Sequence, residues 1–319
     1  MGERCQNVRR LGGFDSCPRT AREEVTTVPS RSLVLLSYGG HDEQVGETKY
    51  AILSAYRRLA PSDDIEIVLY TDNPGMFEDM PVRLRLVGQE ELAAWSGPAG
   101  YPYRRKLEAL SDALNRTGRP VVFVDSDTWF LKSPARLFQR IGRDRSVMHI
   151  REGSLRNPKG PSDWREFIDA AQRRTWLTAS GSPVDISSDI MWNSGVIGLD
   201  PLNGVLVDDA LALVDQVKRS ECDLWCIEQF AVGHSLMRST TLTPAYDVVF
   251  HYWPPPIRTA FHPILLSELD RTADLAAKMR AEQLHRCRPR LHGVARLKHA
   301  IKQAYRWAGG EWLTPGNAS

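Results

Sequence analysis

One apolar run leads directly into two acidic residues and indicates the architecture of the whole chain: Val121-Val122-Phe123-Val124-Asp125-Ser126-Asp127-Thr128-Trp129-Phe130. Four consecutive apolar residues, three of them β-branched, are typical of a central parallel strand that is buried on both faces. Carboxylates are costly inside such a sheet. We therefore expect Asp125 and Asp127 at the carboxyl end of the strand, where open α/β sheets bind their ligands.

The two aspartates are spaced so that both can contact one cation. Side chains at positions i and i+2 of an extended chain point the same way, and Ser126 between them faces elsewhere. Oxygen ligands suit Mg²⁺ or Mn²⁺, and these ions commonly bind substrate phosphates as well. An Asp-x-Asp triplet can also cap a turn or a helix. Taken alone, the triplet leaves both interpretations open.

The pattern along the rest of the chain predicts an α/β fold, a Rossmann-like, mostly parallel sheet with helices on both sides. Strands are expected at residues 33–36, 65–70, 82–86, 121–124, 147–150, 191–199 and 248–250. Helices are expected at about residues 47–60, 106–114, 134–138, 164–173, 205–219 and 225–237. Residues 151–190 are rich in glycine, proline and charge, and they are expected to form a long insertion over the carboxyl face of the sheet.

The amino-acid composition and the cysteines limit the classes of protein to which this chain can belong. The chain has 319 residues, 42% of them hydrophobic and 25% charged, which is ordinary for a folded soluble protein. Its formal net charge of +2 gives no indication of a nucleic-acid partner. Five widely spread cysteines favour reduced thiols and a cytoplasmic location. No apolar run approaches the roughly 20 residues of a membrane span, and no apolar core of signal-peptide type is present at the N-terminus.

The chain is expected to divide into three parts. Residues 1–30 are predicted to be a flexible leader, residues 31–265 the main domain and residues 266–319 a basic helical extension. The segment from Leu284 to Trp307 combines arginines and lysines with apolar residues at helical spacing. Such a helix can lie on the anionic inner face of a membrane, or it can pack on the domain with its charged side in water.

Several polar motifs occur in one order along the chain, and together they resemble a known family. They are Ser37-Tyr38, Lys106, Asp125-Ser126-Asp127, Asn193-Ser194-Gly195, Glu228-Gln229 and His251. This order resembles the glycosyltransferases of the GT-A fold, which are metal-dependent enzymes that use nucleotide-sugars. It is most similar to the retaining families 8 and 32, and the likeness covers roughly residues 31–253.

The resemblance implies a metal site made of Asp125, Asp127 and His251. His251 matches the late histidine that completes the metal sphere in enzymes like those of family 8. The family motif usually continues with glycine, lysine, proline and tryptophan, and the order His251-Tyr252-Trp253-Pro254 departs from it. The alternative for His251 is a histidine that belongs to an aromatic cluster with Tyr252 and Trp253.

The resemblance also implies residues that hold the donor. Lys106 and Asp112 flank the buried stripe of their predicted helix and match residues that hold phosphate and sugar hydroxyls, although both could be solvated helix charges. Other donor-binding candidates are Ser37, Tyr38 and Asp72 at the ends of the first two strands, Ser126 between the aspartates, and Ser194 with Gly195.

Three residues are implied in catalysis: Asn193, Glu228 and Gln229. The first belongs to an Asn-Ser-Gly turn, where glycine permits close approach and unusual dihedrals beside the transferred sugar. Glu228 could bind a sugar hydroxyl, brace the reaction centre or accept a proton, or it could simply favour a helix start. If the reaction inverts configuration, Glu228 or Asp189 is the candidate base.

The function that the resemblance implies is transfer of a hexose from a nucleotide-diphosphate sugar, UDP-linked by the likeness, to an acceptor hydroxyl with retention. Mn²⁺ or Mg²⁺ would be the cofactor, and the acceptor would be a glycan, a lipid-linked molecule or a small molecule. One alternative is a sugar-nucleotide nucleotidyltransferase, which would need a glycine-rich phosphate loop that Ser37-Tyr38-Gly39-Gly40-His41 does not supply. The other is a non-catalytic binding module on the same fold.

Overall fold

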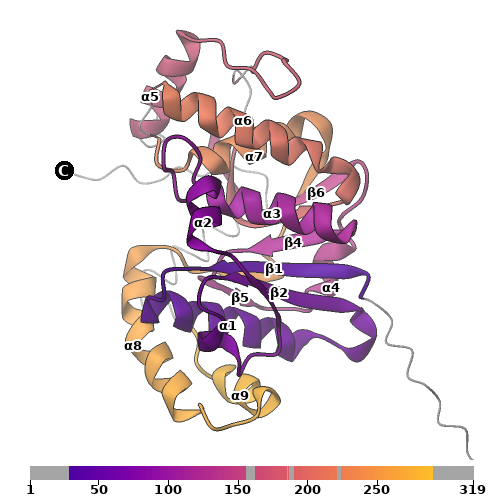
Figure 1. The fold of residues 1–319 in the computed structure, drawn as a ribbon, viewed down its shortest axis with the longest axis vertical. Coiled ribbons are helices and arrows are strands. Elements are labelled where there is room, and N and C mark those ends of the chain that lie inside the picture. Colours follow the sequence, from indigo (N-terminus) through magenta and orange to yellow (C-terminus); the bar gives the residue numbers. More distant parts are fainter. Residues whose placement is uncertain (1–28, 156–161, 185, 187–189, 221–223, 290–319) are drawn as a thin grey trace, which may run out of the picture.

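The computed structural model describes residues 29–155, 162–184, 186, 190–220 and 224–289. In this part of the chain, the larger sheet has seven strands in the order β3-β2-β1-β4-β7-β6-β8 (Figure 1). The pairs β1–β2, β1–β4, β2–β3 and β6–β8 are parallel, and β4–β7 and β6–β7 are antiparallel. The predicted α/β class, with a mostly parallel sheet between helices, is confirmed.

The elements run in chain order as follows. The strands are β1 (Arg31–Ser37), β2 (Ile65–Thr71), β3 (Arg83–Leu86), β4 (Val121–Val124), β5 (Thr128–Phe130), β6 (Arg145–Ser154), β7 (Ile190–Leu199), β8 (Thr241–Pro244) and β9 (Val249–His251). The α-helices are α1 (Asp42–Arg58), α2 (Gln89–Trp95), α3 (Arg104–Thr117), α4 (Ala135–Phe138), α5 (Ser162–Gln172), α6 (Val205–Arg219), α7 (Ile227–Ser239), α8 (Pro255–Arg271) and α9 (Ala277–Leu284).

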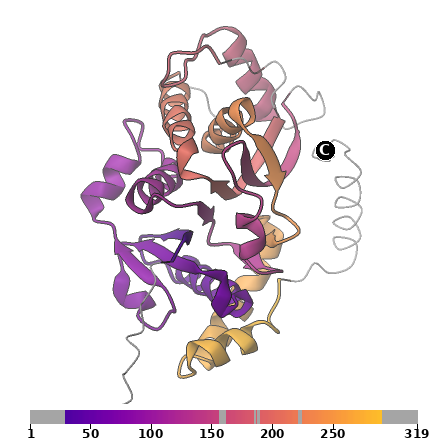
Figure 2. The same cartoon turned by 90° about the vertical axis from the view of Figure 1, so that its right-hand side faces the viewer.

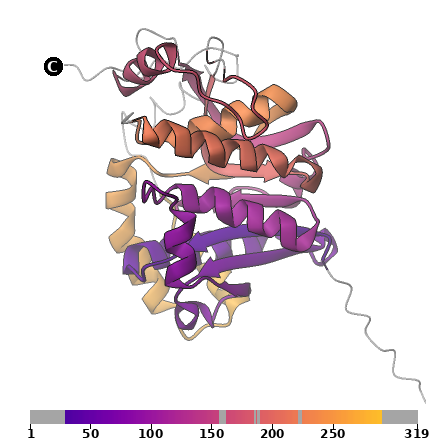
Figure 3. The same ribbon diagram turned by 45° about the horizontal axis from the view of Figure 1, so that its top comes forward.

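The central strand β4 is buried on both faces, as its sequence predicted. Val121 and Phe123 belong to the hydrophobic core on one face of the sheet, and Val122 and Val124 belong to the core on the other. Helices α2, α3, α5, α6 and α7 contribute to the first core, and α1, α4, α8 and α9 to the second (Figures 1 and 2). Figure 3 shows α3 and α6 side by side over the sheet.

Helices α1, α2 and α8 differ from the prediction, and α8 begins at Pro255, before the helical extension expected from residue 266. Helix α1 begins at Asp42 rather than near residue 47, because Asp42 and Glu43 complement the helix dipole in its first turn. Gly46 lies inside this helix, where a Cβ would come within 2.7 Å of Leu266 Cδ2, so the glycine permits close packing of α8 on α1. Helix α2 was not predicted, since its seven residues are too few to show a clear helical period.

The predicted insertion at 151–190 begins as a strand, because β6 continues to Ser154 and stays paired with β7 across two register shifts. The expected domain boundary at 265/266 falls within α8. Most of the basic C-terminal segment lies outside the described residues. In the described ranges, none of the helices combines the length and the apolar character that crossing a membrane requires.

A second, two-stranded sheet pairs β5 with β9, and an ion-pair cluster holds the chain just before β9. Arg140 donates to Asp247 through Nη1 at 2.7 Å and Nη2 at 2.8 Å, and Lys132 Nζ lies 3.2 Å from the same carboxylate. The hydrogen bonds from Arg140 are the main cause that lowers the pKa of Asp247 from 3.8 to about 2. This cluster fixes the start of a strand that carries His251.

The lowered pKa of Asp247 predicts a pH-dependent contribution to stability. A carboxyl with a lower pKa in the folded state stabilises the fold above its unfolded pKa, near 3.8, and loses this contribution as pH falls toward about 2. Asp247→Asn is expected to lower the free energy of unfolding at pH 7. The difference from wild type should shrink between pH 4 and pH 2.5 in urea titrations, and a difference that stays constant with pH would contradict the role of the charge.

Candidate functional site

Asp125 and Asp127 lie directly after β4, at the carboxyl end of the strand, as predicted. Their carboxylates and the imidazole of His251 each offer one ligand atom, and these atoms lie within 4.8 Å of one another. His251 reaches the aspartates because β9 pairs antiparallel with β5, which places His251 opposite Thr128. Residues that are far apart in the sequence thus form one acidic–histidine cluster.

Neighbouring cations keep the Asp127 carboxylate ionised. His251 Nε2 lies 3.1 Å from Asp127 Oδ1, and Arg258 Nη1 lies 3.7 Å from Oδ2. Burial would raise the pKa of Asp127, but these positive groups more than offset it and lower the pKa to about 2. Burial in turn would lower the pKa of His251, and the charge of Asp127 raises that pKa above its ordinary value instead.

The orientation of the His251 ring is fixed by Asn193. Asn193 Nδ2 donates to Glu152 Oε1 at 3.1 Å, so Asn193 Oδ1 faces His251 Nδ1 at 2.9 Å. Because Oδ1 is an acceptor, His251 donates to it from Nδ1, and its Nε2 faces Asp127 Oδ1 at 3.1 Å, where a bound cation would replace the second ring proton. Histidine ligands of metals commonly donate their other ring nitrogen to an oxygen in this way. Glu152 was not predicted, because nothing in the local sequence of β6 pairs it with Asn193.

Replacing Asn193 with alanine is expected to weaken Mn²⁺ binding about 10- to 100-fold, the usual cost of losing such an outer partner of a metal ligand. Isothermal titration with MnCl₂ measures the affinity. Asn203→Ala is the matched control, because Asn203 is a similarly buried asparagine that donates to the carbonyls of Gly142 and Arg143. Equal Mn²⁺ affinity in Asn193→Ala and wild type would contradict this assignment.

The Asn193-Ser194-Gly195 segment does not form the expected turn; it lies inside the extended strand β7. Gly195 is not among the glycines with positive φ, so it is not required for an unusual dihedral. Its role is close approach, because a Cβ at Gly195 would lie 2.2 Å from His251 Nδ1. The strand therefore passes directly against the histidine ring.

Lys106 joins the cluster from α3, one of the positions expected to face the site. Its Nζ donates to Asp125 Oδ2 at 3.0 Å and to Ser194 Oγ at 3.2 Å, and it lies 3.6 Å from Glu228 Oε1. Burial would lower the pKa of Lys106, but Asp125 and Glu228 more than offset it, so the pKa is raised above its ordinary value. Lys106 is therefore a permanent cation beside the two aspartates.

Glu228 and Gln229 lie in the first turn of α7, as predicted, and both are buried. Glu228 accepts from Ser194 Oγ at 3.2 Å, and its Oε2 lies 2.5 Å from the Tyr101 hydroxyl. Gln229 Oε1 accepts from the Ser194 backbone N–H at 3.1 Å, and its Nε2 donates to Glu152 at 3.0 Å. The two side chains thus fix the position of β7, through Ser194, and Glu228 also fixes Lys106.

A cavity of about 440 Å³ opens over the cluster. Lys106, Asp125, Ser126, Asp127 and Arg258 line it together with Tyr38 at the end of β1. The guanidinium of Arg105 lies 4.5 Å from the centre of the Tyr38 ring. Arg258, on α8, was not predicted; its local signal is a basic residue in the first turn of a helix that begins within a run of three prolines.

The remaining donor-binding candidates lie at varying distances from this cavity. Ser37 is buried at the end of β1. Asp72 accepts from the Gly39 backbone N–H at 3.1 Å and from Gln89 Nε2 at 2.7 Å. Asp112 accepts from the Tyr70 hydroxyl at 2.9 Å and from Arg116 Nε at 2.8 Å, and it is not among the residues that line the cavity. Asp189 lies outside the described residues.

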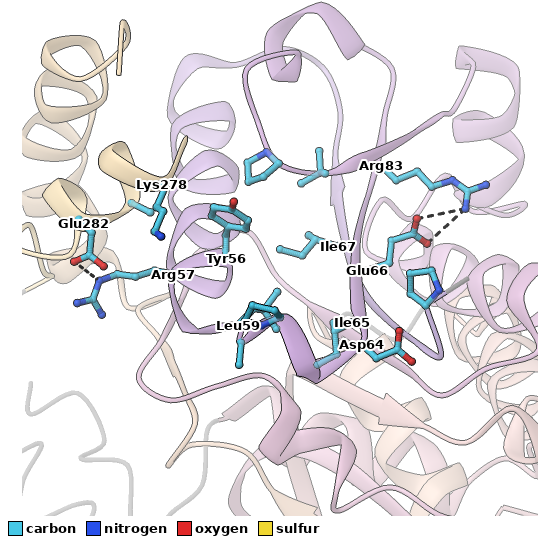
Figure 4. Close-up of a pocket in the computed structure, with 16 residues that line it drawn as sticks. Tyr56, Arg57, Leu59, Asp64, Ile65, Glu66, Ile67, Arg83, Lys278 and Glu282 are labelled. Atoms are coloured by element: carbon cyan, nitrogen blue, oxygen red, sulfur yellow. Dashed lines mark hydrogen bonds and ion pairs between the residues drawn. The ribbon is translucent and has the colours of Figure 1, made fainter. Parts of the chain in front are cut away.

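A larger cavity, of about 790 Å³, lies away from the cluster (Figure 4). It lies between the end of α1, the starts of β2 and β3, and α9, with the ion pairs Arg57–Glu282 and Arg83–Glu66 on its walls. Because strands β2 and β3 begin there, this cavity is at the opposite end of the parallel strands from the ligand-binding edge of such sheets. The smaller cavity is therefore the candidate site.

The cluster fits a divalent cation by the chemistry of its donors. Two carboxylates and one imidazole nitrogen are ligands that Mn²⁺ and related ions accept. Asn193 directs the Nε2 atom of His251 toward the carboxylates, and the absence of a side chain at Gly195 leaves room for the ring. The fold and the site thus define an α/β protein with a candidate cation centre at the carboxyl edge of its parallel strands.

Comparison with known proteins gives a distant likeness only. No protein-family model matches the sequence, and no curated protein matches it. Among solved structures, the chain is similar to the apo structure of WbbM, a bifunctional glycosyltransferase, with a TM-score of 0.43 and 13% sequence identity. The match covers 69% of this chain and 40% of the WbbM chain, so the protein spans less than half of that neighbour's length.

Proposed function

We propose that this protein is a metal-dependent glycosyltransferase that uses a nucleotide-diphosphate sugar as donor. The observation that carries the proposal is that Asp125 and Asp127 line one cavity together with two cations, Lys106 and Arg258, while His251 contacts Asp127 beside it. A binding site that combines a cation centre with two fixed positive side chains is complementary to a diphosphate. The likeness of motif order to families 8 and 32 supports UDP as the nucleotide and retention of configuration.

The chain's own residues would bind and orient the donor. A divalent cation, when bound, supplies Lewis-acid stabilisation of the departing diphosphate. Lys106 and Arg258 add positive charge on two sides of Asp125 and Asp127, where negative charge develops on the leaving group. Tyr38, at the end of β1, lines the cavity where the nucleoside would lie, and the Arg105 guanidinium packs on its ring.

In this proposal, Glu228 and Gln229 hold neighbouring residues of the site in position. Glu228 already accepts from Ser194 and pairs with Lys106, so it fixes the lysine rather than presenting a free carboxylate to the cavity. Gln229 and Asn193 converge on Glu152, which couples α7 to the strand against His251. The acceptor, whether a glycan, a lipid-linked molecule or a small molecule, would supply the attacking hydroxyl.

The loop after β1 does not favour the nucleotidyltransferase alternative. Gly39 and Gly40 have positive φ values of 83° and 69°, as in phosphate-binding loops. However, the Gly39 backbone N–H donates to the Asp72 carboxylate at 3.1 Å. A phosphate would have to compete with this internal anion for the amide.

Thermal shift with a panel of UDP-, GDP- and dTDP-sugars, in MnCl₂ and in EDTA, tests the proposal. One donor is expected to stabilise the protein in Mn²⁺ only, by about 2.7 kcal/mol at a concentration 100 times its Kd. Equal stabilisation in EDTA, or none by any donor, would reject it. In Asp125→Ala, a metal-dependent transferase should lose donor hydrolysis and the Mn²⁺ response, whereas a binding module should keep the affinity for its partner.

A further inference from the structure

Arg258 is held by a carboxylate that lies outside the cluster. Its Nε donates to Glu47 Oε1 at 2.7 Å, and its Nη2 donates to Glu47 Oε2 at 2.5 Å. This is the two-pronged geometry that fixes the plane of a guanidinium. The third nitrogen, Nη1, is left over, and it is the one that lies 3.7 Å from Asp127 Oδ2 beside the cavity.

A glutamate is unexpected at position 47, because its side chain on α1 is fully buried. Its partner Arg258 is 38% exposed. Burying a charged pair gains little stability over well-packed apolar residues, because desolvation offsets the attraction. Stability alone therefore does not account for a carboxylate here. The arrangement does, however, present Arg258 to the cavity in a single orientation.

His262 extends the arrangement along the same helix. It lies one turn after Arg258, with Nε2 2.6 Å from Glu47 Oε1 and Nδ1 3.3 Å from Glu43 Oε2. Glu43 in turn lies one turn before Glu47 on α1. Side chains four residues apart share a helix face, so two facing pairs connect α1 to α8 beside the cavity.

We propose that Glu47 is a positioning residue that orients Arg258 toward the diphosphate of the donor. This inference rests on the proposed function. Glu47 occupies two of the guanidinium nitrogens and leaves Nη1 for a phosphate oxygen next to Asp127. Without Glu47, Arg258 would lose its fixed plane and could pair directly with Asp127, which would remove its charge from the donor.

Binding of inorganic pyrophosphate in the presence of Mn²⁺, measured by isothermal titration, tests the inference without requiring the donor to be known. Glu47→Gln is expected to weaken pyrophosphate binding about tenfold, as loss of an outer partner commonly does. The affinity for Mn²⁺ alone should not change. In an Arg258→Ala background, Glu47→Gln should have no further effect on pyrophosphate affinity, because it acts through Arg258.

His262→Gln is the matched control, since it removes the other partner of Glu47 without touching Arg258; its pyrophosphate affinity should stay within twofold of wild type. Glu47→Asp, which keeps the charge but withdraws it by one methylene, serves if Glu47→Gln does not fold, and it should also weaken pyrophosphate binding. Wild-type pyrophosphate affinity in a folded Glu47 variant, even with a lower Tm, would overturn the inference. Failure of the wild-type protein to bind pyrophosphate with Mn²⁺ would instead reject the proposed function.

Discussion

Asp127→Asn is expected to remove the Mn²⁺ response of donor hydrolysis and to lower its rate at least about 100-fold. The side chain is nearly the same size, so the buried position stays filled, but an uncharged amide replaces the carboxylate whose Oδ1 faces His251 and whose Oδ2 faces Arg258. Loss of an outer partner of a metal ligand already costs about 10- to 100-fold. Loss of a ligand itself should cost at least the upper value.

Hydrolysis of the donor found by thermal shift, with and without Mn²⁺, measures this effect. Asp79→Asn is the control, because Asp79 is also held by ion pairs, with Arg280 and Lys49, yet it does not line the cavity and has no stated role in placing His251. The control should keep full hydrolysis under conditions where it stays folded. Mn²⁺-dependent hydrolysis that survives in Asp127→Asn would exclude the acidic pair as the metal site.

The local signals of the fold were strong enough to read from the sequence. Continuous apolar runs at residues 33–36 and 121–124 predicted buried parallel strands, and both are confirmed as β1 and β4. The order of strands in the sheet, in which β7 and β6 pair antiparallel beyond β4, could not be read, because pairing depends on contacts between distant segments. The pairing of β9 with β5, outside the main sheet, could not be predicted for the same reason.

At the candidate site, too, some residues could be predicted from the sequence, and others became evident only from their tertiary contacts. Asp125, Asp127, Lys106 and His251 were all named from the sequence, and the structure brings them together. The partners that orient them, Glu152, Glu47 and Arg258, were missed. Each is a single charged residue in an unremarkable segment, and only the tertiary contact gives it a role. The Asn193-Ser194-Gly195 motif was recognised, but its glycine was explained by a turn, whereas the structure explains it by contact with a ring.

Gly195→Ala is expected to disrupt the metal site through the His251 ring rather than through the aspartates. An added Cβ would lie 2.2 Å from His251 Nδ1 and 2.4 Å from Cε1, far inside van der Waals contact. The His251 ring has little room to withdraw, because the ring of His149 lies 5.3 Å away, centre to centre, in an edge-on arrangement. The ring must therefore turn and break its hydrogen bond with Asn193, which moves Nε2 away from Asp127.

We expect Gly195→Ala to weaken Mn²⁺ binding at least about tenfold and to lower the free energy of unfolding by about 1–3 kcal/mol, as overpacking commonly does. Titration with MnCl₂ and urea denaturation measure the two effects. Gly233→Ala, where the nearest atom would be 3.7 Å away, should keep wild-type Mn²⁺ affinity. Because the strain comes from the imidazole, adding His251→Ala to Gly195→Ala should recover the stability lost to the clash without restoring Mn²⁺ binding. A Gly195→Ala protein with wild-type Mn²⁺ affinity would show that the position of His251 against β7 does not matter for the metal.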